Sequence, residues 1–261
     1  MKKLLKIDKA IYEVDDEFKF YKFYSTNSNW RKLGEDENYQ NKKLIEGYRK
    51  IMSDKIVPSK NNDKLYHELL SKPVNDLISN LSSSNATRKY QSSKALIEIA
   101  EKTPVKVYPF FDECVKLLEN DNNIIKWTGI IILGNLSSVD VDKKMVKILP
   151  KLFDLLDTGK MITAGNTAMA LASIAKNNSV FSDKITKQLL KVEKYKYDTK
   201  ECGNIAIGHV INAFDVYLEK PDKKVIEFIS RALKNLRPAT AKKAEKYLRS
   251  RLETSDLTKN S

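Results

Sequence analysis

Side chains that commonly serve as nucleophiles, bases or metal ligands are few and far apart in this sequence. The histidines are His67 and His209, and the cysteines are Cys114 and Cys202. Glu68 follows His67 directly, and we interpret the two as a surface pair because their spacing is not that of metal ligands. Cys202 and His209 are two helical turns apart, which separates them by ~10 Å along a helix axis. The sequence contains no glycine-rich phosphate loop, because no Gly-Lys-Ser or Gly-Lys-Thr motif occurs in it. The sequence therefore predicts a non-enzymatic chain with no catalytic centre, no metal and no cofactor.

The elements that would position any binding residues form a repeat. From Leu65 to Leu252 the sequence has the pattern of successive amphipathic helix pairs, and their second helices align at offsets of 37, 38 and 40 residues. The aligned blocks are Ala95–Ile99, Ile132–Leu136, Ala170–Ile174 and Val210–Phe214. Paired helices at such a period are typical of solenoids. We therefore predict an all-α fold, a right-handed α-solenoid of about five helix pairs with a helical N-terminal cap.

The predicted pairs can be given by residue range. They are Asp63–Asn80 with Asn85–Lys102, Pro104–Asn120 with Asn123–Ser137, Asp142–Asp157 with Lys160–Lys176, Ser182–Lys194 with Thr199–Leu218, and Asp222–Asn235 with Ala239–Arg251. Asn85 is expected to cap its helix through its side chain. Residues 63–253 thus form the predicted solenoid, and residues 254–261 a disordered tail.

Residues 1–62 differ from the repeats and are expected to form the helical cap. Leu4, Ile7, Ile11, Val14, Phe18 and Tyr21 are spaced like one stripe of a helix. A second helix is predicted over Asn41–Asp54, followed by a linker over Pro58–Asn62. The many aromatic residues of this segment either cover the first repeat or offer a docking surface, and an exposed repeat end favours the covering role.

The two helices of each pair differ in side-chain size. First helices carry bulky residues such as Phe111 and Leu152, whereas second helices carry small ones such as Gly134, Ala168 and Gly208. Because small residues allow close approach, we expect the second helices to pack tightly and to line the concave side. A glycine inside a helix costs ~1 kcal/mol relative to alanine, so tight packing must offset that cost.

These residues resemble the HEAT/armadillo class of helical repeats. The stretch Asn85–Ala100 is similar to the second helix of a HEAT repeat, and Ile132–Leu136 resembles an armadillo helix with its asparagine. The whole of Asn85–Leu252 resembles small microbial HEAT-repeat proteins with no established activity. In armadillo proteins that bind peptides, concave asparagines hydrogen-bond the peptide backbone. Asn135 matches that position, whereas Asn166, Asn204 and Asn212 do not align with it, and Trp127 stands eight residues before Asn135 instead of four. The alternative is that these asparagines bond to neighbouring turns inside the stack.

The function we predict is a cytoplasmic scaffold that holds a protein or peptide on its concave face. The candidate contact residues are Lys126, Trp127, Thr163, Asn166, Glu201 and Asn204. No apolar run approaches the ~20 residues of a membrane span, and two cysteines without a Cys-x-x-Cys spacing are expected to stay reduced.

The main alternative is a nucleic-acid-binding protein. The chain has a net charge of +13, and residues 183–251 carry 17 Lys and Arg against 9 Asp and Glu. The candidate basic patch contains Arg231, Lys234, Arg237, Lys242, Lys243, Lys246 and Arg249. It could hold phosphates, or it could simply be the solvated face of a terminal repeat. A remote third interpretation is a helical-repeat DNA glycosylase, for which Trp127, Lys126 and Asp121 would be the nearest residues.

Overall fold

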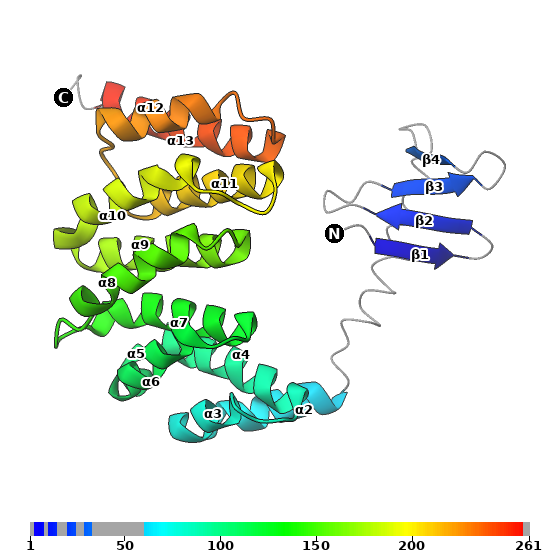
Figure 1. The fold of residues 1–261 in the computed structure, drawn as a ribbon, viewed down its shortest axis with the longest axis vertical. Helices are drawn as coiled ribbons and strands as arrows, with labels where there is room; N and C mark the ends of the chain where they lie inside the picture. Colours follow the sequence, from blue (N-terminus) through cyan, green and yellow to red (C-terminus); the bar gives the residue numbers. More distant parts are fainter. Residues whose placement is uncertain (1–2, 8–9, 15–19, 25–28, 33–59, 258–261) are drawn as a thin grey trace. The chain divides into compact units, whose positions relative to one another are not determined.

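The chain divides into two compact units, Met1–Lys64 and Leu65–Ser261. The computed structural model describes residues 3–7, 10–14, 20–24, 29–32 and 60–257 (Figure 1). The predicted boundary between residues 62 and 63 lies two residues before the observed division.

The described residues between 3 and 32 form an antiparallel sheet and not the predicted helix. Its strands are β1 (Lys3–Ile7), β2 (Ala10–Val14), β3 (Phe20–Tyr24) and β4 (Asn29–Lys32), in the order β1-β2-β3-β4. Ile7 pairs with Ala10, Val14 with Phe20, and Tyr24 with Asn29. The prediction of a helical cap over these residues was therefore wrong.

The physical reason lies in the residue types. Each strand contains β-branched or aromatic residues, which favour a pleated surface over a helix. Only two residues separate β1 from β2, so the three-and-four spacing was counted across a reversal of the chain. The helix predicted over Asn41–Asp54 lies outside the described residues. That the first unit covers the first repeat stays a prediction.

Residues 60–257, which we call the helical unit, form a stack of five helix pairs that begins five residues before the second compact unit (Figure 1). Its first helices, several of which continue into 3-10 turns, are α2 (Lys60–Leu70) with α3 (Val74–Asn80), α5 (Pro104–Val107) with α6 (Phe111–Lys116), α8 (Met145–Asp154), α10 (Ser182–Leu189) and α12 (Lys223–Ala232). Its second helices are α4 (Ala86–Lys102), α7 (Asn123–Leu136), α9 (Met161–Asn177), α11 (Lys200–Tyr217) and α13 (Pro238–Leu257). The prediction of an α-solenoid of five pairs is confirmed for this unit.

Helix starts follow local capping chemistry. The Asn85 side chain accepts a hydrogen bond from the Arg88 N–H at 2.9 Å, as predicted, and Asp222 accepts one from Val225 at 2.9 Å. Two predicted boundaries were wrong. The linker over Pro58–Asn62 overlaps α2, which begins at Lys60, and α13 continues to Leu257, past the predicted start of the tail at residue 254.

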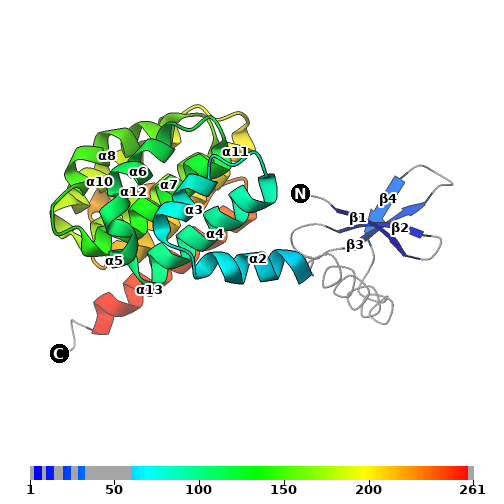
Figure 2. The same cartoon turned by 90° about the horizontal axis from the view of Figure 1, so that it is seen from below.

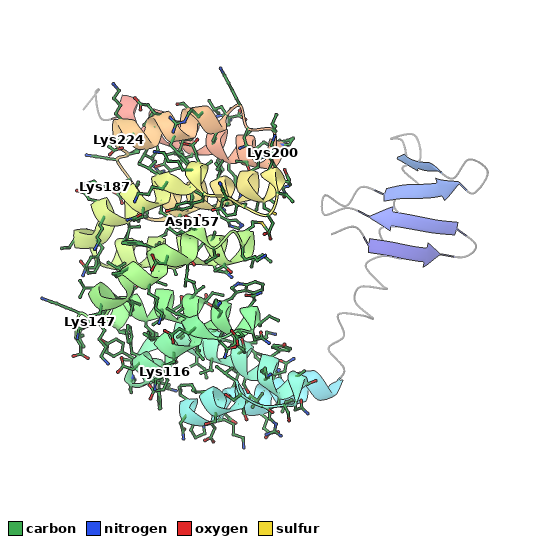
Figure 3. All side chains as sticks on the ribbon, in the orientation of Figure 1. Lys116, Lys147, Asp157, Lys187, Lys200 and Lys224 are labelled. Carbon is green, nitrogen blue, oxygen red and sulfur yellow. The ribbon has the colours of Figure 1, made fainter. Side chains whose placement is uncertain are left out.

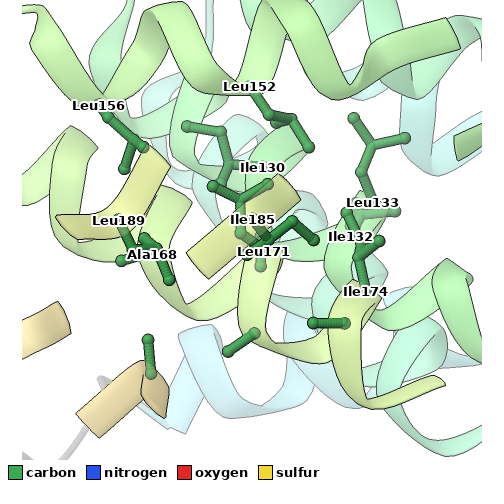
Figure 4. Close-up of a cluster of buried hydrophobic side chains, with 14 of the residues drawn as sticks. Ile130, Ile132, Leu133, Leu152, Leu156, Ala168, Leu171, Ile174, Ile185 and Leu189 are labelled. Atoms are coloured by element: carbon green, nitrogen blue, oxygen red, sulfur yellow. The ribbon is translucent and has the colours of Figure 1, made fainter. Parts of the chain in front are cut away.

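The core lies between the two helix layers. Viewed along the stack, α8, α10 and α12 lie on one side and α4, α7 and α11 on the other (Figure 2). Leu152 of α8, Leu171 of α9 and Ile185 of α10 are fully buried where the layers meet (Figure 4). Because each repeat contributes to a shared core, the unit has one continuous apolar interior.

The second helices of successive repeats pack directly against one another, α4 on α7, α7 on α9, α9 on α11 and α11 on α13. Small residues stand at these crossings. A Cβ atom added to Gly134 would lie 2.9 Å from Cα of Ala170, and one added to Gly165 would lie 2.9 Å from the His209 ring. The glycines therefore allow the close approach that the size pattern predicts.

Candidate binding surface

The surface of the second helices that faces away from the core is formed by a narrow stripe on each helix. First helices cover one side of a second helix, and neighbouring second helices cover its two flanks. On α7 the accessible stripe includes Ile124, Trp127, Ile131 and Asn135, and on α9 it includes Ile162, Asn166, Met169 and Ser173. These spacings of three and four residues place each set on one helix face. We call this surface, with its continuation on α11, the second-helix face.

Asparagines recur along the second-helix face. Asn135 on α7, Asn166 on α9, and Asn204 and Asn212 on α11 are all partly buried. Among the described residues, none of these four amide side chains has a hydrogen-bond partner, although the backbone carbonyl of Asn204 accepts a hydrogen bond from Thr240 at 2.8 Å. We call the four side chains the amide row. The alternative in which they bond to neighbouring turns is therefore wrong.

Apolar side chains lie between the amides. Ile131, Met169 and Ile205 are partly exposed on α7, α9 and α11 respectively. At the N-terminal ends of α7 and α9, Ile124 and Ile162 are 42% and 46% exposed. Their helices carry no carboxylate within Asn123–Leu136 or Met161–Asn177. The middle of the second-helix face therefore offers apolar contact and paired donor–acceptor amides.

Trp127 and Thr163, two of the predicted contact residues, bond to each other. The indole N–H of Trp127 donates to Oγ of Thr163 at 3.0 Å, and Thr163 itself is 2% exposed. The Trp127 ring also packs against the core. The pair joins α7 to α9, so Thr163 is a structural residue and Trp127 offers only part of its ring to a partner.

The remaining predicted contacts are divided between free and paired groups. Lys126 is partly exposed and has no carboxylate partner in the described part of the chain. Glu201 is exposed but forms an ion pair with Arg237 of the fifth repeat. The free residues Ile131, Met169, Ile205 and Asn212 were missed as contacts. Continuing the stripe from Trp127 by four residues at a time would have found Ile131 and Asn135.

The candidate basic patch is only partly available. Arg231 binds Glu193 with a 2.7 Å contact, Arg237 pairs with Glu201, and Arg249 lies 3.4 Å from Glu245. Burial and the nearby Arg237 guanidinium lower the pKa of Lys243, whose ammonium donates to the Gly208 carbonyl at 3.3 Å. The members left exposed without a carboxylate partner among the described residues are Lys234, Lys242 and Lys246.

Two cavities lie elsewhere on the helical unit. One, of about 210 Å³, is lined by residues that include Ser137, Asp140, Met145 and Asn177. Asp140 is already engaged there, because it accepts hydrogen bonds from Tyr108 OH at 2.9 Å and from the Lys144 N–H at 2.8 Å. The other, of about 590 Å³, is lined by Leu70, Pro73, Ile99 and Phe110 among others and by no histidine, cysteine or carboxylate. Neither lining contains a nucleophile paired with a base.

The described residues lack two further features. They contain no group of three or more His, Cys, Asp or Glu side chains placed to hold a metal ion. None of the helices in this part of the chain has the length and apolar character needed to cross a bilayer.

Helix pairs one period apart, stacked through their small-residue helices, decide the fold class. The helical unit is an all-α solenoid of stacked helix pairs. No protein-family model matches the chain, and no curated protein sequence matches it. Among solved structures, it is similar to the designed armadillo repeat protein YIII(Dq.V1)4CPAF in complex with the peptide (KR)4, with a TM-score of 0.49 and 14% identity over 75% of this chain and 95% of that one. The designed armadillo repeat protein YIII(Dq)4CqI gives a TM-score of 0.47 and 15% identity, covering 74% and 95%. An engineered protein from a structural genomics programme gives 0.44 and 17%, covering 76% and 94%.

Proposed function

We propose that this protein is a non-enzymatic cytoplasmic scaffold that binds an extended protein segment along its second-helix face. The observation that carries this proposal is the amide row, whose side chains have no hydrogen-bond partner among the described residues. An asparagine amide both donates and accepts, which matches the donor and acceptor that each residue of a peptide backbone presents. An extended segment leaves these backbone N–H and C=O groups unpaired, whereas a helix pairs most of them internally.

The apolar residues of the second-helix face support the same proposal. Ile131, Met169 and Ile205 alternate with the amides and would contact side chains of the bound segment. Removing apolar surface from water contributes ~25 cal/mol per Å², so these contacts would add affinity while the amides set the register. The candidate contacts therefore become Lys126, Trp127, Asn166 and Asn204 together with these residues, and Thr163 and Glu201 act through their partners.

The test is a comparison of captured proteins. A variant with Asn135→Ala, Asn166→Ala and Asn212→Ala is used as bait in a lysate of the producing organism, beside the wild-type chain. The matched control has Lys116→Ala, Lys147→Ala and Lys187→Ala, exposed residues of the first helices on the other side of the unit (Figure 3). Each lost hydrogen bond removes ~1 kcal/mol, so three should lower the amount of a specific partner at least tenfold.

Quantitative mass spectrometry measures the outcome. The proposal requires at least one protein that the wild type and the lysine control retain and the asparagine variant loses. If the asparagine variant retains every partner, the second-helix face is not the binding surface.

Nucleic-acid binding stays the second candidate, supported by Lys234, Lys242 and Lys246. It predicts an affinity for duplex DNA that falls with salt at a log–log slope of about −0.9 per phosphate neutralised. Absence of DNA or RNA binding at ~50 mM salt would remove it.

A further inference from the structure

The ionic groups of the second helices show which charge a bound segment should carry, an inference that rests on the proposed function. On α7, α9, α11 and α13, the lysines without a carboxylate partner among the described residues are Lys126, Lys176, Lys200, Lys242, Lys243 and Lys246. Lys176 lies in the last turn of α9, and Lys243 donates to the Gly208 carbonyl. The other four lie in the first half of their helices, and we call them the free lysines.

On α7, α9, α11 and residues 238–251 of α13, every carboxylate is paired with an arginine. On α11, Glu201 pairs with Arg237, and Asp215 lies 3.0 Å from an Arg251 nitrogen. Glu245 of α13 lies 3.4 Å from Arg249, and α7 and α9 carry no carboxylate. Over residues 123–136, 161–177, 200–217 and 238–251, the charge that stays unpaired is therefore positive.

The spacing of the free lysines favours isolated carboxylates over a continuous phosphate chain. Packed helices lie ~8–10 Å apart, which an extended chain spans in about three residues. Between Lys126 on α7 and Lys200 on α11 stands α9, whose exposed stripe from Ile162 to Ser173 is neutral, since Lys176 lies only in its last turn. Lys160, which precedes α9, pairs with Asp198 at 3.1 Å. A phosphate backbone would place charge over that neutral stripe and close to the Asp198 carboxylate. A peptide can place a neutral residue there instead.

We propose that the segment bound along α7, α9, α11 and α13 is acidic. Its aspartate or glutamate side chains contact the free lysines, its backbone bonds to the amide row, and its neutral residues lie over Ile131, Met169 and Ile205. Opposite charges on an interface raise the association rate and select the partner more than they raise affinity.

The probes are three fluorescein-labelled peptides of about 12 residues, a length that covers the ~27 Å from α7 to α13 with a margin. Each has the sequence X-Leu-Ser-Ser-Leu-Ser-X-Leu-Ser-X-Leu-Ser, in which X is aspartate, asparagine or lysine and the neutral fourth residue takes the place opposite α9. Fluorescence anisotropy at ~50 mM salt measures their binding to the full chain, beside a labelled thymidine oligonucleotide. We expect the aspartate peptide to bind at least tenfold more tightly than the asparagine peptide, and the lysine peptide to bind most weakly.

A charge-reversed variant provides the second measurement. Lys126→Glu, Lys200→Glu and Lys242→Glu together should reverse the order, so that the lysine peptide binds best. The matched control, Lys116→Glu, Lys147→Glu and Lys187→Glu, changes the net charge equally on first helices and should leave the order unchanged. Circular dichroism melting checks that both variants are folded.

The outcomes separate the two proposals. Equal binding of the aspartate and asparagine peptides, or the same loss of preference in both variants, would overturn the acidic segment and leave the scaffold standing. Tighter binding of the oligonucleotide than of the aspartate peptide, lost in the charge-reversed variant, would overturn it in favour of nucleic acid. Binding of none of the peptides would contradict the scaffold itself.

Discussion

Two helical glycines should respond in opposite directions to the same substitution. A methyl group added at Gly134 would lie 2.9 Å from Cα and 3.0 Å from Cβ of Ala170 on the next second helix. One added at Gly203 would meet Cδ2 of Tyr197 at 3.5 Å, an ordinary van der Waals distance. Alanine is favoured over glycine by ~1 kcal/mol inside a helix, so both changes start with the same gain.

The crowding at Gly134 decides the difference. Carbon atoms prefer ~3.5–4.0 Å, and Cα of Ala170 belongs to the backbone, so α7 and α9 must separate by roughly half an ångström or more. Such overpacking costs ~1–3 kcal/mol. Gly134→Ala should therefore lower the free energy of unfolding by ~0–2 kcal/mol, whereas Gly203→Ala should raise it by ~0.5–1 kcal/mol.

Urea unfolding followed by far-UV circular dichroism measures both variants beside the wild type. An unchanged dependence on urea concentration shows that each variant still unfolds from the same compact state. If Gly134→Ala is as stable as Gly203→Ala or more so, the second helices do not depend on close contact at Gly134, and small residues are not the reason for their packing.

Three further changes test other parts of the helical unit. Burial, and next the Lys243 ammonium, lower the pKa of His209 below its ordinary value of 6.5. Its contribution to stability is therefore complete above pH 6.5 and is lost as the pH falls from that value through the lower pKa of the folded state, because the unfolded chain takes up the proton first. His209→Gln should flatten this part of the curve of stability against pH, and identical curves for the two proteins would contradict this. Burial raises the pKa of the Cys114 thiol to about 12, whereas Cys202 is partly exposed. A thiol reagent at mildly alkaline pH should therefore modify Cys202 of the native chain quickly and Cys114 slowly, and Cys202→Ser should abolish the fast phase. Trp127→Phe should lower the free energy of unfolding by ~1–3 kcal/mol, because it leaves the buried Thr163 hydroxyl without its donor. A double-mutant cycle with Thr163→Val should give a coupling energy of about 1 kcal/mol, and a value of zero would show that the hydrogen bond contributes nothing.

The helix pairs could be predicted because several signals agreed at each of them. The predicted range Asn123–Ser137 differs by one residue from α7, whose Asn122 side chain caps Ile124 N–H at 3.0 Å. Apolar periodicity, small residues and turn residues all recur with the same period. Because these signals agree, the helices of a repeat fold can be predicted from the sequence. The first unit lacked this repetition, so a single stripe of apolar residues was assigned to a helix when its β-branched and aromatic residues form strands.

The binding surface was predicted less well because the sequence does not tell which polar groups are already engaged. Thr163 and Asn166 are three residues apart on one helix. The Thr163 hydroxyl accepts a hydrogen bond from Trp127, whereas the Asn166 amide has no partner among the described residues. That difference depends on contacts between residues about one repeat apart. Helical periodicity gives the direction of a side chain but not its cross-repeat partner.

The same contacts explain where the positive charge of the last third goes. Arg231 binds Glu193, Arg237 binds Glu201 and Arg251 binds Asp215, and the members of each pair are 36 to 38 residues apart. Each of these arginines therefore joins the fifth repeat to the fourth, where a planar guanidinium holds a carboxylate better than an ammonium does. Exposed pairs of this kind contribute ~0–1 kcal/mol each, so their main effect is to remove both charges from the surface. The cationic side chains that stay unpaired on α11 and on residues 238–251 of α13 are then lysines, and Lys200 lies one helical turn before Asn204. A segment bound there as proposed would meet lysine charge beside an amide that can bond to its backbone.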